Sequence, residues 1–267
     1  MIGNAGDRLN VSLLLTALLM AGAASANAAN LNGSDDPTLA LTAPLKGASP
    51  APAGSAAPNP DPRNFEGVWW LQGYEYMLGP QPGVAPPLKP EYMRILERRI
   101  RAKNRGTPEA DASTQCLPHG MPRLMLMHER FEILQRDKAV YFIYQLNRLP
   151  RRAYFGEKLP EGVDPLYLGF SVARWEGNAL VIDSSGFRDG TLLDDSGLPH
   201  TEALKLTERY ELGKDGKTLR VRFTIDDPQT FTHPWSAEAQ YRSRPGLEIR
   251  EEVCADKLKP KKSKAQN

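Results

Sequence analysis

The sequence predicts an all-β protein, an antiparallel up-and-down β-barrel of about eight to ten short strands. From residue 131 onward, apolar residues recur at every second position, which is the period of a half-buried strand. Short turn signals such as Glu176-Gly177-Asn178 separate these segments. Closing such a meander into a barrel removes its exposed edges. A two-sheet sandwich is the alternative architecture.

The predicted elements begin with a strand over residues 65–77. One helix follows over residues 91–103, between the first two strands, because Pro90 suits a first helical turn and Tyr92, Leu96 and Ile100 share a face. The remaining strands are expected at residues 131–135, 139–145, 151–155, 170–175, 179–184, 202–212, 219–226, 235–242 and 247–254.

The ends of the chain predict export. Residues 1–28 combine Arg8, an apolar run over residues 11–24 and two Ala-x-Ala sites, which is typical of a cleavable signal peptide, with an uncleaved anchor as the alternative. Residues 29–63, rich in proline and alanine, are expected to be a disordered tether. Residues 64–256 then form the barrel domain and residues 257–267 a basic disordered tail. We therefore expect a soluble, periplasmic or secreted protein with no membrane span.

Composition and cysteine content narrow the chemistry. Lysine and arginine total 34 against 32 acidic residues, so no overall field favours a nucleic-acid partner. In an exported chain, the pair Cys116 and Cys254 predicts a disulfide. The sequence lacks a nucleophile elbow, a His-Glu-x-x-His motif, a phosphate loop and a dinucleotide fingerprint. We expect neither a cofactor nor a metal.

Strand alternation places carboxylates inside the barrel. Over residues 202–212 the apolar face carries Glu208 inward, and over residues 247–254 it carries Glu251. A charged carboxylate in a dry core is costly and needs a partner. Such residues could serve as acid and base, or each could form a salt bridge with an inward arginine such as Arg152 or Arg174.

Two loops carry further candidates. Prolines and a glycine stiffen residues 116–123, which could mount His119 and Arg123 at a barrel mouth or could simply plug it. His200 and Glu202 share a strand face, as in an acid–base pair, although a surface turn is the alternative. The catalytic candidates are His119, Arg123, His200 and Glu208. The ligand-binding candidates are Arg152, Arg174, Trp175, Glu202, Tyr210 and Glu251.

Two resemblances accompany these patterns. Gly67-Val68-Trp69 resembles the Gly-x-Trp signature of lipocalins, which implies a tryptophan sealing the barrel end under a late arginine, here Arg250. The motifs at residues 116–123, 169–177, 197–202 and 252–254 are similar to a large group of exported bacterial hypothetical proteins, which imports no established activity. These motifs read Cys-x-Pro-x-Gly-x-Pro-Arg, Gly-x-Ser-Val-x-Arg-Trp-Glu-Gly, Gly-x-Pro-His-x-Glu and Glu-x-Cys.

The first functional expectation is an exported barrel that binds a small, largely apolar ligand, aromatic or isoprenoid in character. The second is a cofactor-independent lyase, isomerase or hydrolase that uses histidine and glutamate inside the barrel. The third is a cell-envelope interaction module, which would expose an apolar patch.

Overall fold

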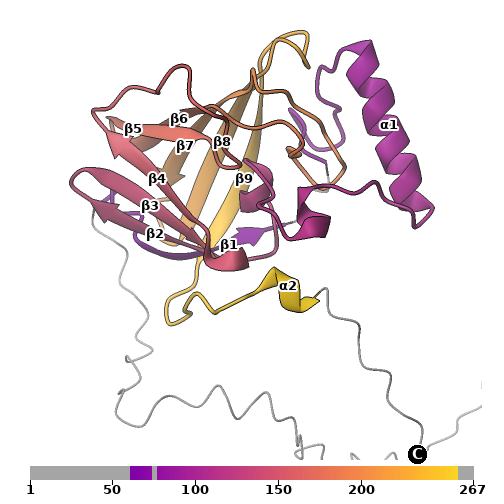
Figure 1. The fold of residues 1–267 in the computed structure, drawn as a ribbon. Helices are drawn as coiled ribbons and strands as arrows, with labels where there is room; N and C mark the ends of the chain where they lie inside the picture. Colours follow the sequence, from indigo (N-terminus) through magenta and orange to yellow (C-terminus); the bar gives the residue numbers. More distant parts are fainter. Residues whose placement is uncertain (1–60, 74–76, 258–267) are drawn as a thin grey trace, which may run out of the picture. The chain divides into compact units, whose positions relative to one another are not determined.

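The computed structural model describes residues 61–73 and 77–257, which contain a closed barrel of nine strands (Figure 1). The predicted signal peptide lies outside the described residues, as do almost all of the predicted tether and basic tail. The strands are β1 Gly67–Gln72, β2 Phe131–Arg136, β3 Ala139–Tyr144, β4 Pro150–Phe155, β5 Phe170–Glu176, β6 Ala179–Ser185, β7 Lys205–Leu212, β8 Thr218–Asp226 and β9 Trp235–Ser243.

Neighbouring strands pair in chain order, and β9 pairs back onto β1 to close the barrel. The predicted all-β barrel is confirmed, but it is not a simple up-and-down meander. The β4–β5 pair is parallel, whereas every other neighbouring pair of the described barrel is antiparallel. A parallel pair needs a crossover connection, because the chain must return to the end from which it started. Residues 156–169 form that crossover.

The predicted helix is confirmed as α1 Pro90–Asn104, which lies outside the barrel between β1 and β2 in the chain (Figure 1). Short 3₁₀ turns cover Ala112–Gln115, Arg123–Met125 and Leu146–Arg148. The predicted strand over residues 247–254 is wrong. That segment runs without regular structure into the short helix α2 Cys254–Lys257. Because β9 pairs with β1, neither of these strands has an open edge that the segment could join.

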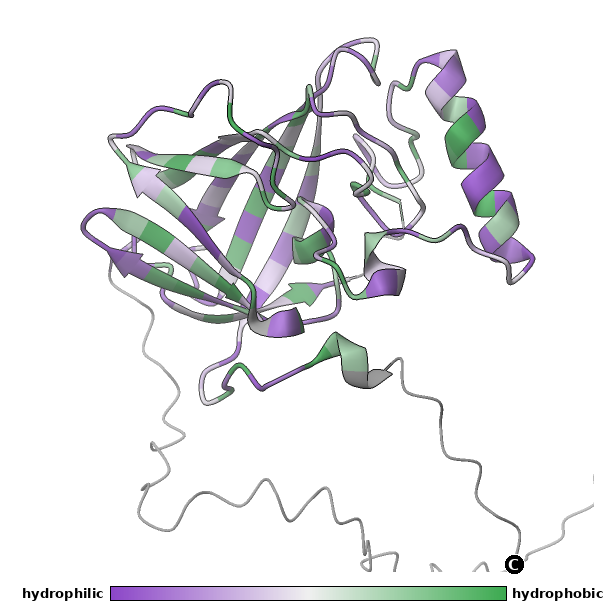
Figure 2. Ribbon diagram, in the orientation of Figure 1, coloured by the Kyte–Doolittle hydropathy of each residue, from purple (hydrophilic) through white to green (hydrophobic). Residues whose placement is uncertain are grey.

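The barrel interior is filled by its own side chains and by residues 119–126, which we call the plug. Apolar and polar residues alternate along several strands (Figure 2), and the inward positions are buried. Met121 and Met125 of the plug are 0% and 1% exposed. The Tyr210 hydroxyl donates to the Met125 Sδ at 3.3 Å, and the Tyr241 hydroxyl donates to the Met125 carbonyl oxygen at 3.1 Å. The sequence left two roles open for the loop over residues 116–123, a mount for His119 and Arg123 or a plug. These contacts support the plug.

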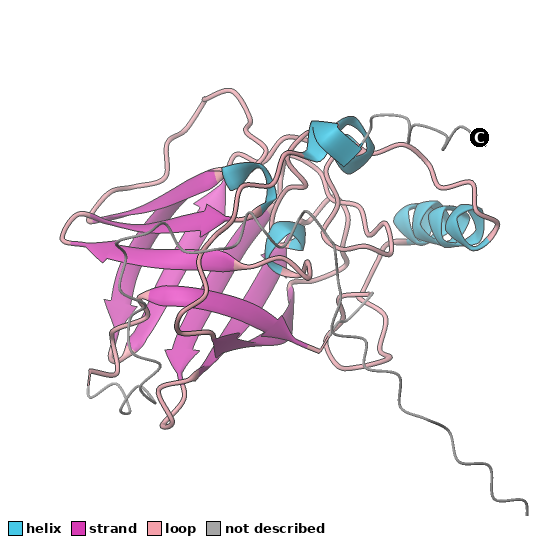
Figure 3. Cartoon of the chain, turned by 90° about the horizontal axis from the view of Figure 1, so that it is seen from below, coloured by secondary structure: helices cyan, strands magenta, loops and turns pink. Residues whose placement is uncertain are grey.

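The predicted disulfide is confirmed. It joins Cys116 to Cys254 across 138 sequence positions and ties the C-terminal segment to the loop that leads into the plug. The backbone N–H of Cys254 also donates to the Asn147 Oδ1 at 3.0 Å. Figure 3 shows the helices gathered beyond one end of the strands, on the same side as this attachment. The disulfide therefore helps to hold the plugged end of the barrel together.

Gly67-Val68-Trp69, the residues that resemble the lipocalin signature, lie at the start of β1, and Arg250 does not cover the tryptophan. Trp69 is 2% exposed, and its indole N–H donates to the Phe65 carbonyl oxygen at 2.9 Å. Arg250 is exposed and lies outside any strand. The late-chain arginine that covers an indole is Arg244, which stands 5.5 Å from the ring of the neighbouring Trp70.

Candidate functional site

The barrel wall is incomplete where β4 meets β5. Their ladder consists of Ala153–Phe155 against Ser171–Ala173, so the first half of β4 has no partner in β5. Pro150 begins β4 without a backbone N–H, which suits an unpaired strand edge. Before β5, the chain turns through Gly169 at φ 63°, where a Cβ atom would stand 2.7 Å from the Ser185 carbonyl oxygen. Only glycine fits there. We call this gap the seam.

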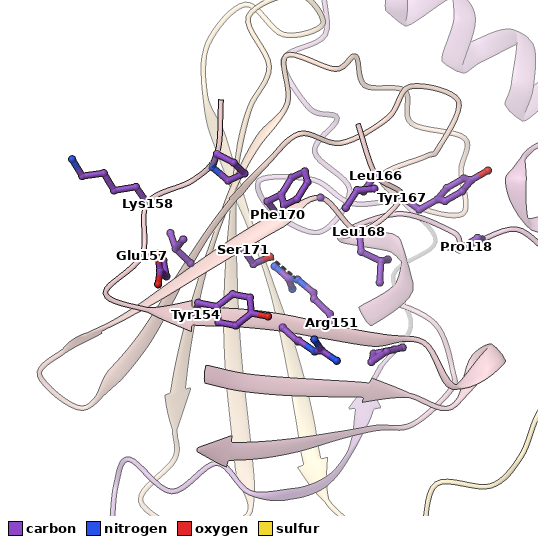
Figure 4. A pocket seen from close by; sticks show the side chains of 15 residues that line it. Pro118, Arg151, Tyr154, Glu157, Lys158, Leu166, Tyr167, Leu168, Phe170 and Ser171 are labelled. Carbon is purple, nitrogen blue, oxygen red and sulfur yellow. Dashed lines mark hydrogen bonds between the residues drawn. The ribbon is translucent and has the colours of Figure 1, made fainter. Parts of the chain in front are cut away.

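A pocket of about 700 Å³ occupies the seam (Figure 4). One wall is β4, which contributes Tyr154, and the other is β5, which contributes Phe170 and Val172. The crossover adds Leu166 and Leu168. Aromatic and aliphatic groups thus supply much of the lining, and the volume falls within the range of about 300–1,000 Å³ that is usual for small-molecule sites.

The two ends of the seam pocket differ in polarity. Figure 4 shows Glu157 and Lys158 at one end and Tyr167 with Pro118 at the other. Pro118 precedes the plug, so the pocket is bounded by both the barrel wall and the loop that closes the barrel. A ligand in this pocket would therefore lie beside the barrel core rather than within it.

Arg151 and Ser171 line the inner side of the pocket, and behind them lies a buried polar cluster. The Arg151 Nε donates to the Ser171 Oγ at 3.0 Å (Figure 4), and the Arg151 Nη2 donates to the Ser184 Oγ at 2.8 Å. Both terminal nitrogens of Arg151 also bond the Glu208 carboxylate, with Nη1 and Oε1 3.0 Å apart. The side chains of Arg151 and Glu208 are 1% and 0% exposed. The Tyr210 hydroxyl adds a bond to Oε1 at 2.9 Å.

The electrostatics fix the protonation states of this cluster. Burial alone lowers the pKa of Arg151, but the adjacent Glu208 carboxylate outweighs burial and raises it above its ordinary value. Burial, reinforced by Glu208, raises the pKa of Tyr210 well above its ordinary value. At neutral pH the cluster therefore holds a guanidinium cation and a neutral phenol. A bidentate pair of this kind fixes geometry as well as charge.

The structure places Glu208 inside the barrel, as strand alternation predicts, and supplies the salt bridge. Its partner, however, is Arg151 rather than the predicted Arg152 or Arg174. Adjacent residues of a strand point to opposite faces, so only one of the two neighbouring arginines can point inward. Arg152 points outward, lines the seam pocket and stacks on Tyr141 at 5.7 Å. Of the predicted ligand-binding residues, only Arg152 lines this pocket.

The other ligand-binding candidates are dispersed. Arg174 is exposed on the outer surface and pairs with Glu176 at 2.8 Å. Trp175 stacks on Phe155 with the ring centroids 6.2 Å apart. Tyr210 belongs to the buried cluster. Glu202 is exposed and lies before the first residue of β7. Glu251 is also exposed, because the strand that was expected to point it inward does not form.

Arg123 connects two loops by ion pairs with Asp111 and Asp195. Its Nη1 lies 2.9 Å from Asp111 Oδ2, and its Nε lies 2.8 Å from Asp195 Oδ1. Burial lowers the pKa of Arg123, but these two carboxylates raise it above its ordinary value. The guanidinium is thus engaged at both edges by the protein's own carboxylates.

The two candidate histidines are both 6% exposed. The His200 Nδ1 donates to the Thr201 carbonyl oxygen at 2.9 Å, so its Nε2 accepts from the Thr191 hydroxyl at 2.6 Å. Burial lowers the pKa of His200. Thr191 also packs against the backbone beside His119, since a Cβ on Gly120 would stand 2.6 Å from the Thr191 Cβ. The structure therefore brings the loops of the two histidines together, whereas the hydrogen bonds of Glu208 lead to Arg151 and Tyr210 instead.

Sequence analysis missed most of the seam pocket. The sequence pattern predicts strands at Tyr154 and Phe170 and a loop at Leu166 and Leu168, and it predicts no binding role for any of them. One signal was available, because the connection between β4 and β5 is longer than a hairpin and carries apolar residues at 163, 166 and 168. A long loop with apolar side chains is often functional.

Comparison with known proteins does not assign the chain to a family. No protein-family model matches the chain, and no curated protein matches it. Within residues 61–73 and 77–257, no group of three or more His, Cys, Asp and Glu side chains is arranged to hold a metal ion. Among the helices of this same part of the chain, none has both the length and the apolar composition needed to cross a membrane.

Proposed function

We propose that the protein binds a small, largely apolar molecule, aromatic or isoprenoid in character, in the seam pocket. The observation that carries this proposal is the pocket itself, a space of about 700 Å³ between β4, β5 and the crossover. Tyr154 and Leu166, which line it, are 41% and 45% exposed. Ligand binding would remove such apolar surface from water, which is favourable.

A thermal-shift screen with aromatic and isoprenoid compounds tests this proposal. A ligand that binds only the folded protein stabilises it by mass action, which is about 2.7 kcal/mol at a hundredfold excess over its Kd. Val172→Trp places an indole in the pocket and should abolish the shift. Val163→Trp is the matched control, because Val163 is an exposed crossover residue outside the pocket lining. A shift that survives Val172→Trp, or no shift with any compound, would contradict the proposal.

Acid–base catalysis by His119, Arg123, His200 and Glu208 is less well supported by their contacts. Arg123 is held by two carboxylates, His200 is hydrogen-bonded at both nitrogens, and Glu208 is held by Arg151. None of these four candidates lines the seam pocket. A cofactor-independent lyase or isomerase would need a reacting group in contact with the substrate.

An envelope-interaction module is the second candidate, and the exposed apolar side chains of β4 and the crossover favour it. Tyr154, Val163 and Leu166 are each more than 40% exposed. If they bind a cell-envelope component, small molecules will give no thermal shift. In that case Leu166→Asp should lower the amount of protein retained in washed envelope fractions, with exposed Thr232→Asp as the control.

We also propose that the protein acts outside the cytoplasm, in the periplasm or the medium. A disulfide that joins distant segments persists in oxidising compartments, which supports this proposal. N-terminal sequencing of the mature protein should find cleavage after Ala28 or Ala26. An intact N-terminus in protein from the producing cell would contradict it.

A further inference from the structure

Arginines on the barrel strands are ion-paired with one exception. Each of the others lies within 4.0 Å of a carboxylate oxygen, whether buried or exposed; these are Arg136, Arg151, Arg174, Arg209, Arg220, Arg222 and Arg242. For Arg152, no carboxylate of the described residues lies within that distance. Its side chain lines the seam pocket.

Aromatic neighbours hold the Arg152 guanidinium in place. Its Cζ stands 5.7 Å from the ring of Tyr141, the residue that faces it across the β3–β4 ladder. A hydrogen bond from the guanidinium to Tyr154 raises the pKa of Arg152 and leaves its other N–H groups to a ligand. A guanidinium that stacks on an aromatic ring keeps its edge donors available, and two parallel N–H groups match the oxygens of a carboxylate or sulfonate.

The charges of the pocket sum to an excess of one cation. Glu208 neutralises Arg151 from behind, and the other charged side chains of the lining are Arg152, Lys158 and Glu157, two cations and one carboxylate. The seam pocket therefore combines an apolar lining with a net positive charge, and Arg152 is its cation on the barrel wall.

We propose that the ligand of the seam pocket is an amphipathic anion, with an apolar body between β4, β5 and the crossover and an acidic group bound by Arg152. Carboxylate, sulfonate and phosphate share the required chemistry. This inference rests on the proposed small-molecule function and adds the charge of the ligand to it.

Two fluorescent probes with the same ring skeleton test the inference. 8-Anilino-1-naphthalenesulfonate carries an acidic group, and N-phenyl-1-naphthylamine lacks it. Both brighten when they leave water, so their Kd values can be measured on the full-length protein and on its variants. Arg152→Gln removes the cation, and Arg220→Gln is the matched control, because it removes an exposed strand arginine of the same charge whose nearest carboxylate is 4.0 Å away.

We expect Arg152→Gln to weaken the sulfonate probe about three- to fivefold, as for a solvent-accessible ion pair, and to leave the neutral probe unchanged. Arg220→Gln should change neither. Equal effects of Arg152→Gln on both probes, or no effect on either, would overturn the anion proposal while leaving the pocket intact. Failure of the neutral probe to respond to Val172→Trp would instead overturn the pocket itself. Near-ultraviolet circular dichroism of each variant verifies that it is folded.

Discussion

The buried Arg151–Glu208 pair yields a specific prediction. Replacing Glu208 and replacing Arg151 should both destabilise the protein, but the two losses should depend differently on pH. Glu208→Gln keeps the shape of the side chain but leaves the Arg151 cation without a counter-charge in a site that is almost fully buried. Breaking a buried pair from one side costs about 3–5 kcal/mol. The guanidinium cannot lose its proton in the accessible pH range, so the loss should be the same from pH 5 to pH 8. Guanidinium chloride denaturation measures the free energy of unfolding.

Arg151→Met leaves the Glu208 carboxylate without its partner. Unlike a guanidinium, a carboxylate can become neutral by taking up a proton. Below the pH at which the unfolded carboxylate ionises, near 4.3, the orphaned Glu208 is neutral and its cost is small. The stability loss should grow as the pH rises, because the unfolded chain releases this proton more readily than the folded protein. Combining Glu208→Leu with Arg151→Met should recover much of the loss. Equal pH profiles for the two single variants, or losses below about 1 kcal/mol as for a surface pair, would refute this reasoning.

Other features give further predictions. Replacing Cys116 and Cys254 with alanine should lower the free energy of unfolding by about 2–5 kcal/mol, measured against denaturant, since the disulfide closes a long loop. Burial lowers the pKa of His200 in the folded protein below the value near 6.5 that the residue has in the unfolded chain. The contribution of neutral His200 to stability is therefore complete above about pH 6.5 and is lost as the pH falls through the folded-state pKa. His200→Gln should therefore flatten the rise in melting temperature between pH 5 and 7, whereas exposed His233→Gln should not. Gly120→Ala should cost more than about 2 kcal/mol, because its positive φ and the 2.6 Å approach to Thr191 both oppose a Cβ atom.

The strand pattern could be predicted because burial imposes it directly on the sequence. Leu204, Leu206 and Glu208 alternate with outward polar residues, and the structure buries all three. The same pattern misled at residues 247–254. Alternation reports that a segment could present an apolar face, but not that a sheet edge remains for it to join. Here β9, the preceding strand, pairs with β1 and has no free edge to offer.

The candidate site was harder to predict, because it depends on pairing direction and on a single position in a strand. Hydrophobic period is the same for parallel and antiparallel partners, so the β4–β5 crossover leaves no periodic signal. The adjacent arginines 151 and 152 likewise present one charge inward and one outward, and a shift of one residue exchanges their roles. The sequence marked the Glu208 end of the buried pair correctly, but it could not say which arginine meets it.

The location of a bound ligand tests the central claim most directly. Methyl-resolved NMR of the full-length protein, titrated with N-phenyl-1-naphthylamine, reports each site separately. The account predicts that the methyl signals of Leu166, Leu168 and Val172 shift with one common Kd, while those of Ile133 and Val221, buried on the inner barrel face, stay in place. Shifts concentrated at Ile133 and Val221 would show that the ligand enters the barrel interior and would contradict the assignment of the seam as the binding site.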